Sequence, residues 1–434
     1  MLSKRKIINA LFVLSFPWYG FGAYRLAAKG FAEGILVCTI PYVLILSFYL
    51  IDLGYKQVPL PKVNRKFYLV LGALLSAAVS ILVGLHYKSP LINPANGTLL
   101  IILYFSPFLS AVVLHVYNRN DPGFDPAWLI TKGLLAYVAV NVLGMAAGMH
   151  NRLHSFAGRA SPPFAVGIYD AAHILALLNL ILMVYLMERK PKLLHWVAMA
   201  AAYGMNMLIM LSINSRLSVM IFVVLTALFA TKVMKSLRGL YTVALFTVPI
   251  MMTFGQLIYQ VLSLPVFASF LERVNEKDIT TFNGRTYLWQ AGAEWIWNDR
   301  RGFLFGNGFN GHYHLRLLTE EARMFGSSNS AVIHFHSSFF EILINQGIVG
   351  ILLMYGVFWA GYKFYRHQYS ARLRLAPLYA GFVYFMFTWQ IDIENFSYNM
   401  GFMVLFVLMG PVVMARIPPE TNGMLAEQPR PDGR

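Results

Sequence analysis

The sequence predicts an all-α, polytopic membrane protein with about 12 transmembrane helices and one large loop outside the bilayer. Hydrophobic residues make up 58% of the chain and charged residues only 12%, a composition that does not suit the surface of a water-soluble protein of this length. Apolar runs recur along the sequence, and one long polar interval, Thr281 to Gly350, interrupts them. We therefore expect the chemistry of the protein in that interval.

The predicted spans are runs of roughly 18 to 25 mainly apolar residues. The first run follows a basic start, Lys4-Arg5-Lys6, and lacks a small-residue cleavage site, so we interpret it as a retained span. An even number of spans places both termini on one side of the membrane. The spans begin near Ile8, Gly34, Phe67, Thr98, Ala127, Gly167, Leu194, Leu217, Gly239, Ser338, Leu375 and Ser397.

Basic residues indicate which side of the membrane each connection occupies. Lys and Arg accumulate in cytoplasmic connections, and most of them fall in segments that are inside if the amino terminus is inside. Both termini are then expected in the cytoplasm and the long loop outside. The same bias accounts for the net charge of +16. Nucleic-acid binding is not expected, because the basic residues are spread over loops rather than grouped with aromatic residues on one face.

The pattern divides the chain into four regions. Residues 1–265 form the N-terminal transmembrane helices, with about nine spans, and residues 266–337 form the external loop with the active-site residues. Residues 338–416 form the C-terminal transmembrane helices, and residues 417–434 are a polar, Pro-rich tail that we expect to be disordered in the cytoplasm. The single Cys38 excludes a disulfide framework.

Three arginines, Arg159, Arg216 and Arg285, lie at or near the outer ends of spans, against the topological bias. An Asn-Ser pair precedes Arg216 and an Asn-Gly pair precedes Arg285, so both arginines are expected in a first helical turn, where the dipole disfavours a cation. Helix starts bind anions, and a guanidinium there predicts a phosphate site. Alternatively, each arginine extends to lipid headgroups or pairs with an acid. The candidate acids are Glu294, Asp392 and Glu394.

A polar segment also precedes the tenth predicted span. Ser338 and Glu341 have the spacing of a capping box, so we expect Ser338 to be the N-cap and Glu341 to be structural rather than catalytic. His336 stands just ahead of this cap, near the positive end of the helix dipole, which favours a neutral imidazole. His336 is therefore the candidate general base, which would activate a hydroxyl group. Alternatively, it is an interfacial histidine that satisfies a loop carbonyl.

The other histidines of the polar interval are candidate metal ligands. His334 is expected to point away from His336 if the segment is extended. The pair His334/His336 and the pair His312/His314 could each contribute to a zinc site, but no cysteine or carboxylate stands at a standard ligand spacing. We therefore predict neither a metal site nor a cofactor.

The glycine-rich stretch FGNGFNG, residues 305–311, lacks the spacing of a phosphate-binding loop and is interpreted as a tight turn. The segment that contains Trp289, Trp295 and Trp297 is interpreted as an amphipathic helix at the membrane interface. Contact of these tryptophans with lipid is expected, and stacking on a sugar is the alternative.

Several motifs follow one another in a characteristic order. They are Ser215-Arg216, Gly284-Arg285-Thr286-Tyr287-Leu288-Trp289, Gly306-Asn307-Gly308-Phe309, and His336 through Gly350, with Arg159 and Pro162-Pro163 upstream. Together they resemble the O-antigen ligase and polymerase superfamily of bacterial membrane glycosyltransferases, from about residue 159 to residue 350. Many members have Asn after the histidine, whereas Ser337 stands here.

The resemblance implies a GT-C-like fold in the bacterial inner membrane, with a large periplasmic loop and a cavity open to the periplasm. Members transfer a glycan from an undecaprenyl pyrophosphate carrier to an acceptor hydroxyl, without a nucleotide sugar or a metal. Carried over to this chain, Arg216 and Arg285 would hold the pyrophosphate, and Arg159 would assist with the carrier or glycan. His336 would be the base, and attack opposite the leaving group would invert the anomeric carbon.

The resulting hypothesis is a metal-independent inverting glycosyltransferase that polymerises lipid-linked repeat units of O-antigen or exopolysaccharide. Its expected partners are an undecaprenyl-pyrophosphate-linked donor, a lipid-linked glycan or lipid A core acceptor, and a chain-length regulator. One alternative is an O-antigen ligase that moves a finished glycan onto lipid A core. Another is a transporter or flippase of lipid-linked sugars, which would place ionisable groups near the bilayer midplane. Here Asp170, His173, Asp392 and Glu394 are expected toward the outer ends of their spans.

Overall fold

A computed structural model describes residues 3–152, 158–188, 192–231, 242, 285–324, 329–330, 333–393 and 396–414. Over these residues the chain forms helices, and the only β-pairing is an isolated bridge between Val63 and Met414. Eight of the described helices are long and apolar enough to cross a membrane, and two shorter apolar helices accompany them. The prediction of an all-α polytopic membrane protein is confirmed.

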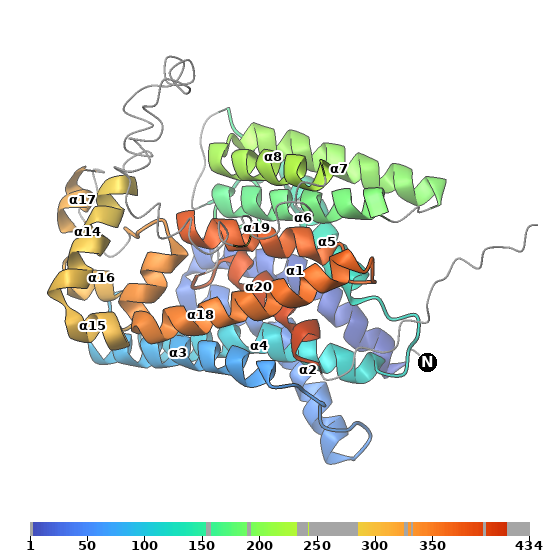
Figure 1. Cartoon of the computed structure of the whole chain (residues 1–434), viewed down its shortest axis with the longest axis horizontal. Coiled ribbons are helices and arrows are strands. Elements are labelled where there is room, and N and C mark those ends of the chain that lie inside the picture. Colours follow the sequence, from blue (N-terminus) through green and yellow to red (C-terminus); the bar gives the residue numbers. More distant parts are fainter. Residues whose placement is uncertain are drawn as a thin grey trace, which may run out of the picture.

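The helices lie where the apolar runs predict them (Figure 1). The ninth predicted span, near Gly239, lies outside the described residues. The helices that match predicted spans are α1 (Lys4–Lys29), α2 (Phe31–Gly54), α3 (Lys66–His86), α4 (Pro94–Asn118), α5 (Pro126–Ala146), α6 (Ile168–Glu188), α7 (Leu193–Ile213), α8 (Arg216–Ala230), α18 (Ser338–Ser370), α19 (Leu378–Ile391) and α20 (Met400–Val413).

Local sequence explains several of the helix starts. Asn93 and Asp125 are N-caps whose side chains accept from the backbone N–H of Asn96 and Trp128, and proline follows each cap at the first helical position. The helices α6, α19 and α20 are apolar on all sides and buried over most of their length, so they form the centre of the bundle.

One end of the bundle is tied by basic residues. Lys4 Nζ lies 2.7 Å from Asp52 Oδ1, which joins the start of α1 to the end of α2. Arg374 Nη1 donates to the carbonyl of Phe124 at 2.6 Å, which joins the segment before α19 to the segment before α5. These contacts bring together helix ends that were predicted to share the inner side.

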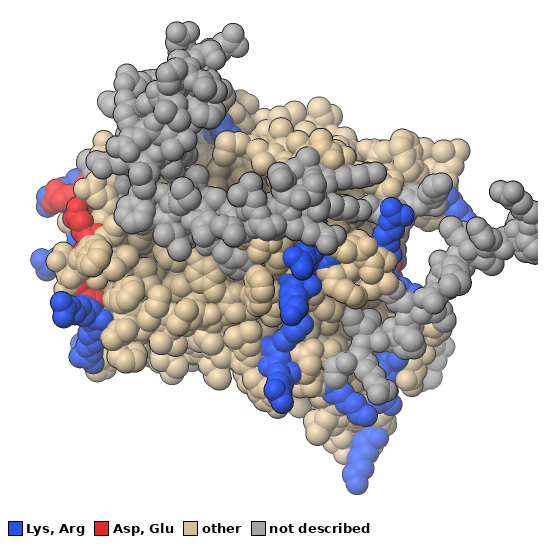
Figure 2. Space-filling model, in the orientation of Figure 1, with Lys and Arg blue, Asp and Glu red and all other residues tan. Residues whose placement is uncertain are grey.

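The opposite end carries the short helices of the polar interval: α14 (Arg285–Asn298), α15 (Arg300–Phe305), α16 (Gly311–His314) and α17 (Thr319–Met324). Figure 1 shows α14 to α17 together at the left end of the body, away from the amino terminus. Figure 2 shows acidic side chains gathered at that same end, whereas broad parts of the visible surface carry no charge.

The glycine-rich stretch fastens this polar segment to the bundle. Gly306 and Gly308 have φ angles of 79° and 80°, which glycine adopts without steric cost. The backbone N of Asn307 donates to the carbonyl of Ile344 at 2.8 Å, and the backbone N of Gly308 donates to the carbonyl of Asn345 at 3.0 Å. The prediction of a tight turn at residues 305–311 is confirmed.

The carbonyls of Ile344 and Asn345 can accept these hydrogen bonds because the helix α18 is interrupted close to them. Gly347 has φ 70° and ψ −171°, so the helix changes direction there. A Cβ atom on Gly347 would lie 2.5 Å from the carbonyl oxygen of Leu304, a distance that no side chain tolerates. The first turns of α18, residues 338–346, therefore form a separate segment that faces the polar helices.

Candidate functional site

Arg285 is the first residue of α14 and contacts the end of α19. Its Nη1 donates to the carbonyl of Ile391 at 2.6 Å, and its Nη2 lies 3.4 Å from Asp392 Oδ2. Arg285 is the first described residue of α14, and the Asn283-Gly284 cap expected before it lies outside the described residues. Arg285 also pairs with an acid, Asp392, as the alternative interpretation predicts.

Asp392 is the common partner of the site. Its Oδ1 accepts from its neighbour Ile393 N at 2.9 Å, and its carbonyl accepts from both the backbone N and the Oγ of Ser338, each at 2.9 Å. Burial by itself raises the pKa of the Asp392 carboxyl, but the charge of Arg285 and the contacts of two imidazoles outweigh it and hold that pKa well below its usual value. Asp392 is therefore a carboxylate at neutral pH.

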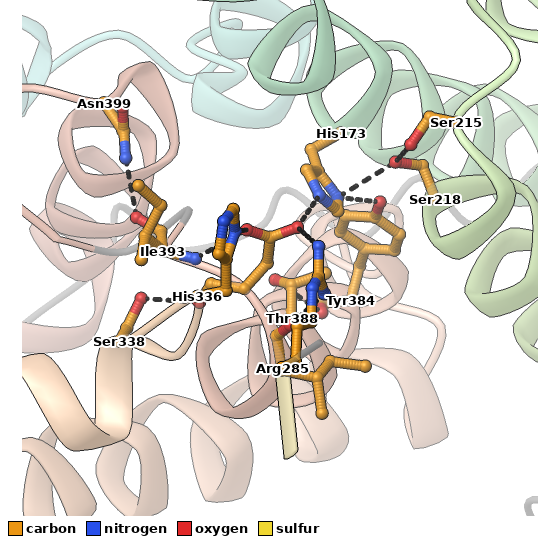
Figure 3. A network of polar contacts seen from close by, with 12 residues as sticks. His173, Ser215, Ser218, Arg285, His336, Ser338, Tyr384, Thr388, Ile393 and Asn399 are labelled. Carbon is orange, nitrogen blue, oxygen red and sulfur yellow. Dashed lines mark hydrogen bonds and ion pairs between the residues drawn. The ribbon is translucent and has the colours of Figure 1, made fainter. Parts of the chain in front are cut away.

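His336 faces this carboxylate from the segment before α18. Its Nδ1 lies 3.8 Å from Asp392 Oδ1, a distance of electrostatic contact rather than of a direct hydrogen bond. The His336 side chain is 40% exposed, so a substrate can reach its ring. Figure 3 shows His336, Arg285 and His173 arranged around one acidic group.

The helix cap behind His336 differs from the prediction. Ser337, not Ser338, is the N-cap of α18, and its side chain accepts from Phe340 N. Ser338 instead bonds to Asp392, so the expected capping box with Glu341 is wrong. Asp392 takes the hydroxyl of Ser338 because the end of α19 packs directly against this turn.

The expected orientation of His334 is also wrong. The rings of His334 and His336 lie 4.2 Å apart, centroid to centroid. The two side chains share one side because His336 has a φ angle of 47°, so the segment is not extended. Burial and the neighbouring His336 lower the pKa of His334 well below its usual value, and His334 is therefore neutral at pH 7.

Both backbone polar groups of Phe335, the residue between the histidines, are fixed. Glu341 Oε1 accepts from Phe335 N at 2.9 Å, and the indole of Trp289 donates to the Phe335 carbonyl at 2.9 Å. Glu341 is 2% exposed and also accepts from Asn345 Nδ2 at 3.3 Å. These contacts suit the structural interpretation of Glu341, since they hold the histidine segment in place.

The tryptophans correct another expectation. Trp289 and Trp295 are buried in protein, and Trp295 donates to Asp299 Oδ2 at 3.1 Å, so lipid contact is wrong for both. Their N–H groups find partners inside the fold because α14 packs against α15 and α18. Trp297 is the exposed member of the group.

Arg216 and Arg159 lie at the same end of the bundle as Arg285. Arg216 is exposed and opens α8, with Ser215 at the N-cap position as predicted. Arg159 is half-buried, and the N–H of the next residue, Ala160, donates to the carbonyl of Ser212 in the last turn of α7. The structure thus groups the four predicted site residues at one end of the bundle, with Arg285 and His336 on the same carboxylate.

Sequence reasoning missed two members of this site. Asp392 entered only as a candidate arginine partner, and His173 only as an ionisable residue near the outer end of a span. His173 Nε2 lies 3.2 Å from Asp392 Oδ2, and its Nδ1 lies 2.6 Å from the hydroxyl of Tyr384. One sequence feature could have indicated both residues: a histidine and an aspartate stand in otherwise apolar runs. Ionisable groups in such runs cost free energy and usually mark a functional site. In the described part of the chain, no three His, Cys, Asp or Glu side chains are arranged to hold a metal ion.

Residues 201–355 match the family model described as O-Antigen ligase. The predicted resemblance to the O-antigen ligase and polymerase superfamily is confirmed for this part of the chain. The O-antigen ligase match contains Arg216, Arg285 and His336, whereas Arg159, His173 and Asp392 lie outside it. It supports a multi-pass membrane enzyme of surface polysaccharide assembly that acts on lipid-linked glycans. No curated protein matches the chain.

Proposed function

We propose that the protein is a glycosyltransferase that polymerises undecaprenyl-pyrophosphate-linked repeat units of O-antigen or exopolysaccharide at the periplasmic face of the inner membrane. The observation that carries the proposal is the pair of groups on Asp392: a guanidinium, from Arg285, and a partly exposed imidazole, from His336. A cation and a base side by side suit a reaction in which an anionic group leaves and a hydroxyl loses its proton.

The arginines supply the site for the leaving group. Arg285 uses one nitrogen on the Ile391 carbonyl and one on Asp392, which leaves further N–H groups of its five donors for a phosphate. Arg216 adds a second cation at a helix start, where free backbone N–H groups also bind anions, and Arg159 would assist with the carrier or glycan. Neutralising the charge that develops on pyrophosphate is the largest catalytic contribution we expect.

His336 supplies the base. With Nδ1 directed toward Asp392, the ring carries its proton on that side and presents Nε2 to an acceptor hydroxyl. The hydroxyl proton passes to Nε2, the acceptor oxygen bonds to the anomeric carbon, and the carbon–oxygen bond to pyrophosphate breaks with its electron pair on the leaving group. Attack from the side opposite the pyrophosphate inverts that carbon. Proton transfer of this kind contributes about 10²- to 10⁴-fold.

The name of the matched family favours a second candidate, an O-antigen ligase that transfers the finished glycan onto lipid A core. The same groups would serve, because only the acceptor differs. The glycolipid profile of a gene-deletion strain separates the two. Lipopolysaccharide with a single repeat unit indicates a polymerase, whereas carrier-linked polymer together with bare core indicates a ligase.

A transport function is separated by an assay without a membrane barrier. Purified protein in detergent, supplied with a lipid-linked glycan, should release undecaprenyl pyrophosphate and lengthen or transfer the glycan. Transport cannot produce new glycosidic bonds in detergent. If the protein forms none while a deletion strain accumulates untransported donor, the proposed enzyme function is wrong.

A further inference from the structure

His173 is a buried, polar side chain that the proposed reaction does not use. It lies in the second turn of α6 and is 2% exposed. Its two ring nitrogens contact different elements: Nε2 lies 3.2 Å from Asp392 Oδ2 at the end of α19, and Nδ1 lies 2.6 Å from the Tyr384 hydroxyl within α19. Figure 3 shows the ring between these two groups. A buried imidazole with both nitrogens engaged has a fixed orientation.

The direction of each hydrogen bond follows from the charge of Asp392. A carboxylate only accepts hydrogen bonds, so the His173 proton lies on Nε2 and is donated to Asp392. Nδ1 is then an acceptor and receives the hydroxyl proton of Tyr384. Asp392 therefore fixes the tautomer of His173, and the Tyr384 hydroxyl, which can donate or accept, donates to the ring nitrogen that this tautomer leaves without a proton.

The same ring is linked to the start of α8. Ser218 Oγ lies 3.3 Å from His173 Nδ1, and Ser215 Oγ lies 2.8 Å from Ser218 Oγ. Ser215 is the N-cap position that directly precedes Arg216. His173 thus lies between the helix start that carries one arginine and the carboxylate that contacts the other.

We propose that His173 is a positioning residue for the transfer reaction: it holds Asp392 so that Oδ2 stays on Arg285 while Oδ1 stays toward His336. The inference rests on the proposed function, because it names a residue that acts through that site. Asp392 has one oxygen shared by His173 and Arg285 and the other toward His336. Loss of the His173 donor leaves Oδ2 with Arg285 alone, while Ile393 N still holds Oδ1. The carboxylate can then turn about the Ile393 contact, and this turn displaces both reactive groups.

The test uses a pair of amide substitutions. The amide nitrogen of Gln can take the place of His Nε2, whereas the shorter Asn reaches only the position of Nδ1. We expect His173→Gln to keep kcat/KM within about threefold of wild type and His173→Asn to lower it about 10- to 100-fold, the range typical of residues that orient a catalytic group. Tyr384→Phe, which removes only the hydroxyl, should fall between them. Apparent unfolding temperatures in detergent are measured for each variant.

A double-mutant cycle distinguishes positioning from a general structural effect. If His173 acts through Asp392, adding His173→Asn to Asp392→Asn should lower activity no further than Asp392→Asn alone. Additive losses, equal losses for the Gln and Asn variants, or full activity of His173→Asn would each overturn the proposal. The same cycle on the unfolding temperature measures the His173–Asp392 contact independently of activity. Wild-type protein without transferase activity would refute the proposed function, whereas active wild type with an active His173→Asn variant refutes only this inference.

Discussion

The guanidinium of Arg285 contacts the end of α19 at two points, the Ile391 carbonyl at 2.6 Å from Nη1 and the Asp392 carboxylate at 3.4 Å from Nη2. A planar fork makes both contacts at once and still directs N–H groups outward. A lysine ammonium is a single point charge and cannot span the two acceptors.

Arg285→Lys should therefore reduce transfer nearly as much as Arg285→Ala, by about 10- to 100-fold, the value of one hydrogen bond to a charged group. The measurement is turnover of a lipid-linked glycan by purified protein. Arg323→Lys is the matched control, because Arg323 lies in the same polar segment but is 70% exposed and pairs only with Glu320 among the described contacts. Full activity of Arg285→Lys would contradict the bidentate role.

His336→Ala should abolish the base and lower the rate of transfer by about 10²- to 10⁴-fold, while membrane insertion and the unfolding temperature stay close to wild type. The side chain is partly exposed and no helix depends on it, so its loss removes little packing. His367→Ala, at the far end of α18 and exposed, serves as the control. A normal rate for the His336 variant would remove it from the reaction.

Buried His312 should make the protein sensitive to mild acid. Burial lowers the pKa of His312 in α16 to about 4, compared with roughly 6.5 in an unfolded chain. Between these values the unfolded chain binds a proton that the folded protein excludes, so the contribution of His312 to stability falls as the pH falls from about 6.5 to about 4 and changes little above that window. Burial raises the pKa of the neighbouring Glu341 to about 7, which acts in the opposite direction and is the same in wild type and variant. His312→Gln should flatten the decline in unfolding temperature between pH 7 and pH 5. His150→Gln, an exposed histidine, should leave the decline as in wild type, and an unchanged slope in the His312 variant would refute the prediction.

Gly347→Ala should destabilise the contact between α18 and the glycine turn. The conformation at Gly347 is one that only glycine adopts readily, which costs other residues about 1 to 3 kcal/mol, and the added Cβ would meet the Leu304 carbonyl. We expect a lower unfolding temperature and reduced transfer together. Gly72→Ala is the control, because its Cβ would meet only a flexible leucine methyl at 3.4 Å. If the two variants unfold at the same temperature, the glycine is not required.

The sequence was sufficient to predict the helices, and it pointed to candidate site residues whose roles stay predictions. The length of a hydrophobic run predicts a span whatever packs around it. Arg285 and Arg216 stand out because a cation is unfavourable at a helix start, and the cap residues just before each arginine indicate that start. The glycine turn was predictable for the same reason, since glycine at close spacing indicates positive φ angles.

The remaining features depend on contacts between distant segments. Asp392 lies far along the chain from His336, and no local pattern states that the end of α19 meets the start of α18. Because of that contact, the N-cap of α18 is Ser337 and not the predicted Ser338, whose hydroxyl donates to the Asp392 carbonyl. The orientation of His334 depended on one backbone angle at His336, and the burial of Trp289 depended on its bond to the Phe335 carbonyl.

The carbonyl of Asp392 receives both the backbone N–H and the hydroxyl of Ser338, while its carboxylate receives Arg285. One residue therefore couples three segments that are remote in sequence. A shift in the last turn of α19 would carry the cation and the turn behind the imidazole in the same direction, so their separation would be preserved. We expect this end of the molecule to respond to a bound glycan lipid as one rigid block, and selection among acceptors to depend on what can reach that block rather than on its rearrangement.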